Sequence, residues 1–267
     1  MSAEALRASM SVESRGAWSP GRFVAAALAM AFVGAVGIFA IAVWQTVLIG
    51  VVTDVVWEPP LSGARQQIVS TVALGLATTM TAGIYLAYTN RSLSFLDVRT
   101  PTLREVAWAV GGLVALFALL QVISVAFETF GISTSQHSTT QAAESEPSLL
   151  LPLIPLSLLI IGPGEELLYR NVVQKGLYEH APRWAAVLTG SVIFSLVHIP
   201  AYSTGGTTGQ LVATLAVVFT LSLVLGTVYE RTENLLVPAF VHGSYNAILF
   251  GFEYLEKTAG LLVPTLL

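Results

Sequence analysis

Long apolar runs, separated by short charged segments, most limit what this chain of 267 residues can fold into. Hydrophobic residues make up 54% of the chain and charged residues only 10%, whereas soluble domains carry about 25% charged residues. In lipid, backbone N–H and C=O groups must be satisfied within the protein, so only helices and closed barrels cross a bilayer. Runs of about 20 apolar residues indicate spanning helices, and the chain is therefore predicted to be an all-α, polytopic membrane helix bundle.

The runs between charged residues leave room for seven spanning helices. They lie between Arg22 and Asp54, between Arg65 and Arg91, and over 107–127, about 148–166, 184–199, 210–229 and 235–252.

The composition also excludes several kinds of site. The chain has no cysteine, which rules out disulfides, thiolate metal sites and cysteine nucleophiles. Its formal net charge of -4 provides no basic surface of the kind that nucleic-acid binding needs. We therefore expect no nucleic-acid partner. The composition predicts that the protein lies in a lipid bilayer.

Basic residues fall in alternate segments between the predicted spans. One set of segments carries Arg7, Arg15 and Arg22, then Arg91, Arg99 and Arg104, then Lys175 and Arg183, and then Arg231. The loops 131–148 and 201–210 contain neither Lys nor Arg. Because cytoplasmic loops carry an excess of Lys and Arg, this alternation predicts a multi-pass protein with a cytoplasmic N-terminus and an external C-terminus. We expect it in the plasma membrane of a prokaryote.

A few ionisable side chains lie within the predicted spans, where they cost several kcal/mol and by default indicate a functional site. They are Glu165, Glu166, His198 and His242, with Asn246 beside the last of them. The two other histidines of the chain, His137 and His180, lie in predicted loops, where we expect them to be solvated.

Helical spacing separates the two glutamates. Glu166 and Arg170 are four residues apart, on one helix face and with the acid first, which favours an ion pair. Glu165 is displaced by about 100° around the helix and is left free to act. For Glu165 to reach the depth of His198, the fourth helix must continue past Arg170, with a bend near Pro163.

The residue types alone leave several site classes open. Two histidines and a glutamate, here His198, His242 and Glu165, form a zinc ligand set with an open position, although the H-E-x-x-H pattern of zincins is absent. A transporter or proton relay also buries Glu and His, but we find no repeated halves of the kind that transporters have. Each polar residue taken singly is also compatible with a structural hydrogen bond between helices.

Three short motifs carry a resemblance to a known family. The segments "EELLYR" (165–170), "FSLVH" (194–198) and "HGSYN" (242–246) resemble the EExxxR, FxxxH and HxxxN motifs of the CPBP family, in the family's order. This family comprises the CAAX prenyl endopeptidases and the bacteriocin-processing or Abi proteins. The resemblance implies an intramembrane endopeptidase.

The resemblance also implies roles for the individual residues. Glu165 and His198 match the pair that activates a water, and His242 and Asn246 match the residues that stabilise the oxyanion. Glu166 and Arg170 match the residues that brace the site.

What the resemblance leaves open is the cofactor and the substrate. We favour a metal-independent site, because Asn246 suits an oxyanion better than a zinc ion; a zinc ion held by Glu165, His198 and His242 is the alternative. The expected substrate is a peptide or protein, with a prenylated C-terminus as one alternative. A non-proteolytic immunity or scaffolding protein on the same fold also stays open.

The predicted organisation follows from these assignments. It comprises a polar N-terminal tail (1–21), N-terminal transmembrane helices (22–130), a polar loop (131–147), a CPBP-like catalytic core (148–252) and a C-terminal tail (253–267).

Overall fold

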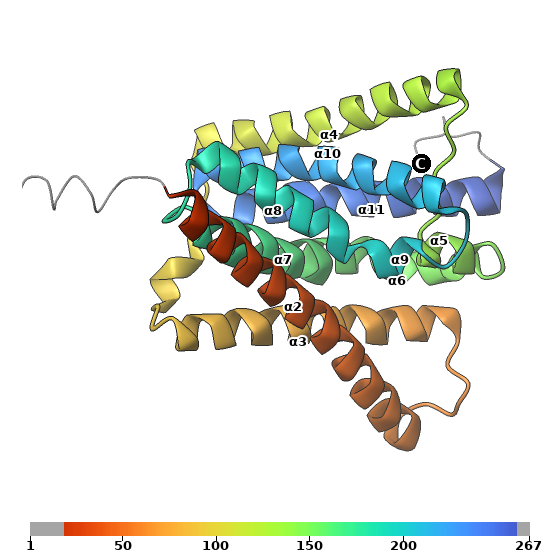
Figure 1. Cartoon of the computed structure of the whole chain (residues 1–267). Helices are drawn as coiled ribbons and strands as arrows, with labels where there is room; N and C mark the ends of the chain where they lie inside the picture. Colours follow the sequence, from red (N-terminus) through yellow and green to blue (C-terminus); the bar gives the residue numbers. More distant parts are fainter. Residues whose placement is uncertain (1–18, 261–267) are drawn as a thin grey trace, which may run out of the picture.

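A computed structural model describes residues 19–260, and in that range the chain is a bundle of helices without strands (Figure 1). Two 3₁₀ turns, η1 and η2, and two π-helical segments, η3 and η4, connect the α-helices. The elements are α2 (Pro20–Val55), α3 (Gly63–Tyr88), η1 (Leu93–Leu96), α4 (Leu103–Phe130), α5 (Ser138–Ala143), η2 (Pro147–Leu149), α6 (Leu150–Leu156), η3 (Ser157–Ile161), α7 (Gly162–Glu166), η4 (Leu167–Gln174), α8 (Arg183–Val197), α9 (Ile199–Tyr202), α10 (Thr208–Thr232) and α11 (Leu236–Ala259).

The all-helical fold is confirmed, but the predicted count of seven spans is not. Within residues 19–260, five stretches are long and apolar enough to cross a membrane: α2, α3, α4, the composite 147–174, and α10. Helix α8 has only 15 residues, about 22 Å, which is shorter than the roughly 30 Å hydrocarbon layer. Helix α11 is long enough with 24 residues, but polar residues, among them His242 and Asn246, make it less apolar than the five.

Consecutive long helices run in opposite directions (Figure 1). The starts of α2, α4, α8 and α11 therefore share one end of the bundle with the ends of α3, η4 and α10. We call it the arginine-rich end, because these elements and their loops carry Arg22, Arg91, Arg99, Arg104, Lys175, Arg183 and Arg231. The basic segments that alternate along the sequence thus lie together at one end of the bundle. That this end faces the cytoplasm stays a prediction.

The stretch from Pro147 to Gln174 is a continuous helical rod in the middle of the bundle, which confirms the long fourth helix. Pro155 and Pro163 lack the N–H that an α-helix needs at each position. The π-helical segment η3 lies between them, and the second π-helical segment, η4, follows α7 directly. Such π-helical turns are frequent at functional sites. Glu165 and Glu166 lie in the short α7 between the two π-helical segments.

Two glycines allow this central rod to touch α11 backbone to backbone. A Cβ atom placed on Gly162 would lie 2.6 Å from the carbonyl oxygen of Ala239 and 2.7 Å from the backbone N of Gly243. A Cβ atom on Gly243 would lie 2.6 Å from the carbonyl oxygen of Ser157. Small residues at helix crossings in membranes allow this close approach. The contact brings the glutamates of α7 next to His242 of α11.

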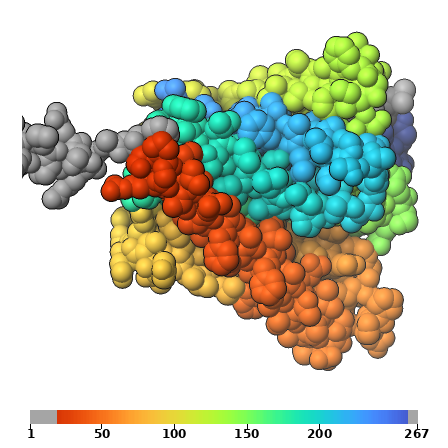
Figure 2. Space-filling view, in the orientation of Figure 1, coloured from red at the N-terminus to blue at the C-terminus, as the bar shows by residue number. Residues whose placement is uncertain are grey.

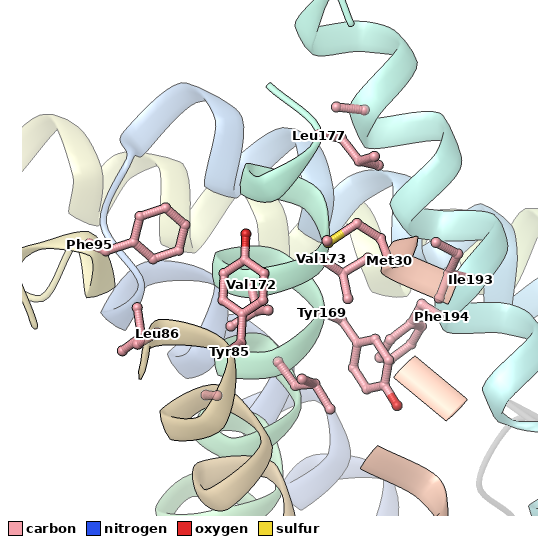
Figure 3. Close-up of a cluster of buried hydrophobic side chains, with 13 residues drawn as sticks. Met30, Tyr85, Leu86, Phe95, Tyr169, Val172, Val173, Leu177, Ile193 and Phe194 are labelled. Carbon is pink, nitrogen blue, oxygen red and sulfur yellow. The ribbon is translucent and has the colours of Figure 1, made fainter. Parts of the chain in front are cut away.

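A buried apolar cluster holds the central rod against its other neighbours. Tyr169, Val172 and Val173 of η4 lie among side chains of α2, α3, η1 and α8 (Figure 3). A second cluster joins α4, α10 and α11. On the outside of the bundle, large apolar side chains stay exposed: Leu28 and Phe32 of α2 are 67% and 71% exposed. Figure 2 shows this helix lying obliquely across the surface of the bundle, a position that fits contact with lipid rather than with water.

Several predicted boundaries can be compared with the helices. The predicted polar loop 131–147 contains the short helix α5, and α11 continues to Ala259, past the predicted core end at 252. Most of the predicted N-terminal tail and the last residues of the C-terminal tail, 1–18 and 261–267, lie outside the described residues.

The glycine crossing yields the first prediction. Gly162→Ala and Gly243→Ala should each destabilise the protein by about 1–3 kcal/mol, because the added methyl group overlaps backbone atoms that cannot move aside. Unfolding in detergent, followed by circular dichroism, measures the change. Gly83→Ala is the matched control, because a Cβ at Gly83 of α3 meets nothing within 4 Å. Equal stability of all three variants would contradict the importance of the crossing.

Candidate functional site

A buried carboxylate joins two of the three sequence motifs. Glu166 is fully buried and binds Arg170 through its Oε2, at 3.0 Å from Nε, as the spacing predicted. Its other oxygen, Oε1, lies 2.9 Å from Nδ1 of His242 on α11. Since an ionised carboxylate only accepts hydrogen bonds, Nδ1 of His242 is the donor. Glu166 therefore orients the histidine of the third motif as well as binding the arginine of the first.

Arg170 is fully buried as well, and it has partners beyond Glu166. Its NH2 group donates to the hydroxyl of Ser222 on α10 at 3.0 Å. Its guanidinium lies over the ring of Phe194, 4.8 Å from the centroid, a favourable cation–π distance. The site is thus connected to α8 and α10 through Phe194 and Ser222, and no sequence motif pointed to Ser222.

The FxxxH spacing orients His198, which follows the last residue of α8. The backbone N–H of His198 donates to Ser195, which leaves the Phe194 carbonyl free. That carbonyl accepts a hydrogen bond from Nδ1 of His198 at 2.7 Å, and the two rings are 4.4 Å apart. Because Nδ1 holds the proton in this bond, Nε2 of a neutral His198 is unprotonated and can accept a hydrogen bond or bind a metal.

Glu165 faces both histidines and does not pair with Arg170. Its Oε2 lies 4.0 Å from Nε2 of His198 and 3.8 Å from Nε2 of His242. These distances are too long for direct hydrogen bonds but suit one bridging water. The Glu165 side chain is 14% exposed and that of His198 is 20% exposed, so the three groups share a largely enclosed space.

Among the site residues predicted from the sequence, Asn246 has the fewest contacts that would indicate its role. It lies one helical turn beyond His242 on α11, on the same face, and its side chain is half-buried. Within residues 19–260 it takes part in no side-chain hydrogen bond with the protein. Its carboxamide is therefore available to a ligand.

The donor chemistry around Glu165 fits zinc only in part. In their neutral forms, His198 and His242 would each present an unprotonated Nε2 while Nδ1 holds the ring in place, which is a familiar arrangement of zinc ligands. Nevertheless, no group of three His, Asp or Glu side chains within residues 19–260 is placed so that it could hold a metal ion. The separations of 3.8 and 4.0 Å to Glu165 exceed the roughly 3.3 Å between ligands of a tetrahedral zinc ion.

The sequence analysis did not identify two side chains that lie near His198, Tyr202 and His137. The ring of Tyr202, on α9, lies 6.4 Å from the His198 ring, and His137 lies edge-on to Tyr202 at 5.0 Å. Burial, and to a smaller degree the Glu165 carboxylate, raises the pKa of Tyr202 to about 12, so its hydroxyl stays protonated at neutral pH. The position of Tyr202 four residues after His198 was the available signal.

The expectation that His137 is solvated was wrong. Its side chain is half-buried, and its Nδ1 accepts a hydrogen bond from the N–H of Thr139 at 3.0 Å, where it caps α5. Burial, with a smaller repulsion from His198, lowers the pKa of His137 to about 4. The loop 131–147 thus folds back against the site. His180, by contrast, is exposed, as expected.

Comparison with known proteins agrees with the motifs. Residues 147–248 match the family described as "Type II CAAX prenyl endopeptidase Rce1-like". The chain is also similar to a protein of Bacillus subtilis (strain 168) named "Putative membrane peptidase YdiL", with 30% identity over 147 residues. The similar region covers 54% of this chain and 55% of that protein, so the chain matches about half the length of its relative. No solved structure matches the chain. Together with the five apolar helices, these similarities identify an integral membrane protein.

Removing the Glu166 carboxylate should damage the fold. Glu166→Ala leaves Arg170 buried without its counter-ion, which we expect to cost about 3–5 kcal/mol of unfolding free energy, measured in detergent. The double variant Glu166→Leu/Arg170→Met should recover most of the loss, because no unpaired charge stays buried. Glu165→Ala is the control and should retain near wild-type stability. A stable Glu166→Ala protein would show that the pair is not a structural requirement.

The depressed pKa of His137 predicts a pH dependence. The unfolded chain takes up a proton at His137 near pH 6.5, but the folded protein does so only near pH 4. This histidine therefore contributes stability that is complete above about pH 6.5 and declines as the pH falls toward 4. The variant His137→Asn should show a smaller loss of melting temperature over this range, whereas His180→Asn should behave like the wild type. Identical pH profiles for both variants would contradict the burial of His137.

Proposed function

We propose that this chain is an intramembrane endopeptidase that cleaves a peptide bond with an activated water, in keeping with the match of residues 147–248 to the Rce1-like family of type II CAAX prenyl endopeptidases. The observation that carries the proposal is the convergence of three helices on one point. Oε2 of Glu165, on α7, lies within 4.0 Å of the Nε2 atoms of both His198 and His242. No serine or cysteine nucleophile is needed for this chemistry.

Glu165 is the general base of the proposed mechanism. A water placed between Glu165 and His198 donates one hydrogen bond to Oε2 and one to the unprotonated Nε2, and its lone pair then points toward the substrate. Glu165 takes up the proton as the water oxygen attacks the carbonyl carbon. The same carboxylic acid then delivers the proton to the departing amine, so that the carboxylate is regenerated.

His242 and Asn246 provide the proposed oxyanion site. Nδ1 of His242 donates to Glu166, so Nε2 donates to an oxyanion only when the imidazole is charged. Charge balance favours this state: the carboxylates Glu165 and Glu166 then face two cations, Arg170 and His242. The amide N–H of Asn246, one turn away, is the second donor. Donors of this kind typically contribute about 2.7–4 kcal/mol each to transition-state stabilisation.

Glu166 and Arg170 act as supports in this proposal. They are fully buried and bonded to one another, and neither faces the space between Glu165 and His198. Through Glu166 they hold the ring of His242, and through the Phe194 ring they contact the residue that orients His198.

We propose that the reaction needs no metal. The separations of 4.0 and 3.8 Å between Glu165 and the two histidines favour a bridging water over a shared ion. A zinc ion, if one binds, would be held by Glu165, His198 and His242 and would supply Lewis-acid activation of the water.

The proposed substrate is a peptide or protein cleaved near the membrane. The family name indicates a prenylated C-terminus, and a prenylated segment would already be concentrated in the lipid around the site. The geometry of the side chains carries the hydrolytic chemistry, whereas the lipid requirement rests on the family.

The decisive experiment measures cleavage of a fluorogenic prenylated CAAX peptide and of its unprenylated twin, with and without a chelator. Glu165→Ala and His198→Ala should each lower the rate at least about hundredfold, the usual minimum for a lost general acid–base residue. The purified variants should elute and melt like the wild type. Glu128→Ala and His180→Ala, at exposed positions, are the controls.

Three outcomes would contradict parts of the proposal. Full activity of Glu165→Ala would remove the general base, and loss of activity with chelator that zinc restores would replace the metal-free mechanism. No cleavage of either peptide by a folded wild-type protein would count against a CAAX-type substrate.

A further inference from the structure

A groove on the outside of the bundle, lined by none of the proposed catalytic residues, lies between α4 and α10, which run side by side (Figure 1). It has a volume of about 500 Å³ and an almost wholly apolar lining. Its walls include Gly111, Gly112 and Ala115 of α4 and Leu223, Val224 and Thr227 of α10. We call it the α4–α10 groove.

The small residues of α4 explain why the groove is hollow. A Cβ atom on Gly111 would meet nothing within 4 Å, whereas one on Gly112 would lie 2.9 Å from Val228 of α10. Gly112 thus lets the helices touch at the base, and Gly111 leaves the space above open. Both walls belong to membrane-spanning helices, so the groove opens toward lipid chains rather than water.

A polar pocket of about 550 Å³ lies at the arginine-rich end of the same two helices. It is lined by Arg104 of α4 and Arg231 of α10, among other charged residues. Arg104 precedes the groove residue Trp108 by one helical turn, and Arg231 follows Thr227 by one turn. Helical spacing therefore places both arginines in line with the walls of the groove.

The charges around this pocket leave one cation in excess. Most of the charged side chains here are paired: Arg99 with Glu105, Arg183 with Glu233, Arg231 with Glu230, and Lys175 with Asp97. Arg104 is exposed and has no carboxylate partner within residues 19–260. One unpaired guanidinium at the end of a membrane-spanning helix matches the single charge of a phosphodiester.

We propose that the α4–α10 groove and the pocket beside it bind one anionic phospholipid. Its phosphate is held by Arg104, with Arg231 beside it, and one acyl chain occupies the groove past Gly111. Trp108 lies at the junction, where amphipathic aromatic rings are usually found at the membrane interface. The site does not depend on the catalytic residues or on proteolysis.

The test is native mass spectrometry of the purified full-length chain in detergent. The probes are phosphatidylglycerol and phosphatidylcholine with the same acyl chains. The wild type should retain one phosphatidylglycerol in preference to phosphatidylcholine. Arg104→Gln should weaken phosphatidylglycerol binding about fivefold, the effect expected for one basic residue near a charged membrane surface, and remove the preference. Gly111→Leu should weaken the binding of both lipids at least fivefold, because its side chain fills the groove.

Matched controls separate these effects from general damage. Arg22→Gln removes an arginine of α2 at the same end, and Gly83→Leu fills an exposed, uncrowded glycine of α3; both should bind lipid like the wild type. Unchanged binding in Arg104→Gln and Gly111→Leu would overturn the proposal, as would equal retention of the two lipids by the wild type. Displacement of phosphatidylglycerol by S-farnesylcysteine methyl ester in the wild type, but not in Gly111→Leu, would instead assign the groove to a prenyl chain.

Discussion

The buried carboxylate of Glu166 is the interaction on which the rest of the site depends. Removing an ion from water costs several kcal/mol, and only close partners with good geometry offset that cost. Glu166 has two, Arg170 at 3.0 Å and His242 at 2.9 Å. Because His242 lies on another helix, its bond to Glu166 restricts how α11 can rotate relative to the central rod. The observed orientation directs Nε2 of His242 toward Glu165.

The second constraint is steric. Gly162 and Gly243 let backbones meet where any larger residue would hold the helices apart. The π-helical segments on either side of α7 change the direction of the neighbouring side chains within one continuous rod. Phe194 completes the arrangement, since its ring lies under Arg170 and its carbonyl orients His198. The buried pair Glu166–Arg170 and the partly exposed Glu165 are therefore separate residues, so Glu165 stays accessible although its neighbour is enclosed.

Some of this was predictable from local spacing. The pairing of Glu166 with Arg170 follows from four-residue spacing, and the long fourth helix follows from the depth of Glu165. The burial of His137 was not predictable, because its partner Tyr202 is 65 residues away in the sequence. The role of Ser222 was equally hidden, since serine occurs in many membrane helices without an ionic partner. The predicted count of seven spans was not confirmed, because α8 has only 15 residues and is shorter than the bilayer.

The long apolar runs alone establish that the chain is a membrane helix bundle, because runs of about 20 residues satisfy their backbone in lipid as helices. The sequence also singled out the polar residues that we propose as the site, because ionisable groups are rare and costly in such runs. Which atoms face one another becomes visible only in the folded bundle. Helix rotation and crossing depend on contacts between distant segments, and those contacts decided that Glu165 meets two imidazole nitrogens while Glu166 is enclosed.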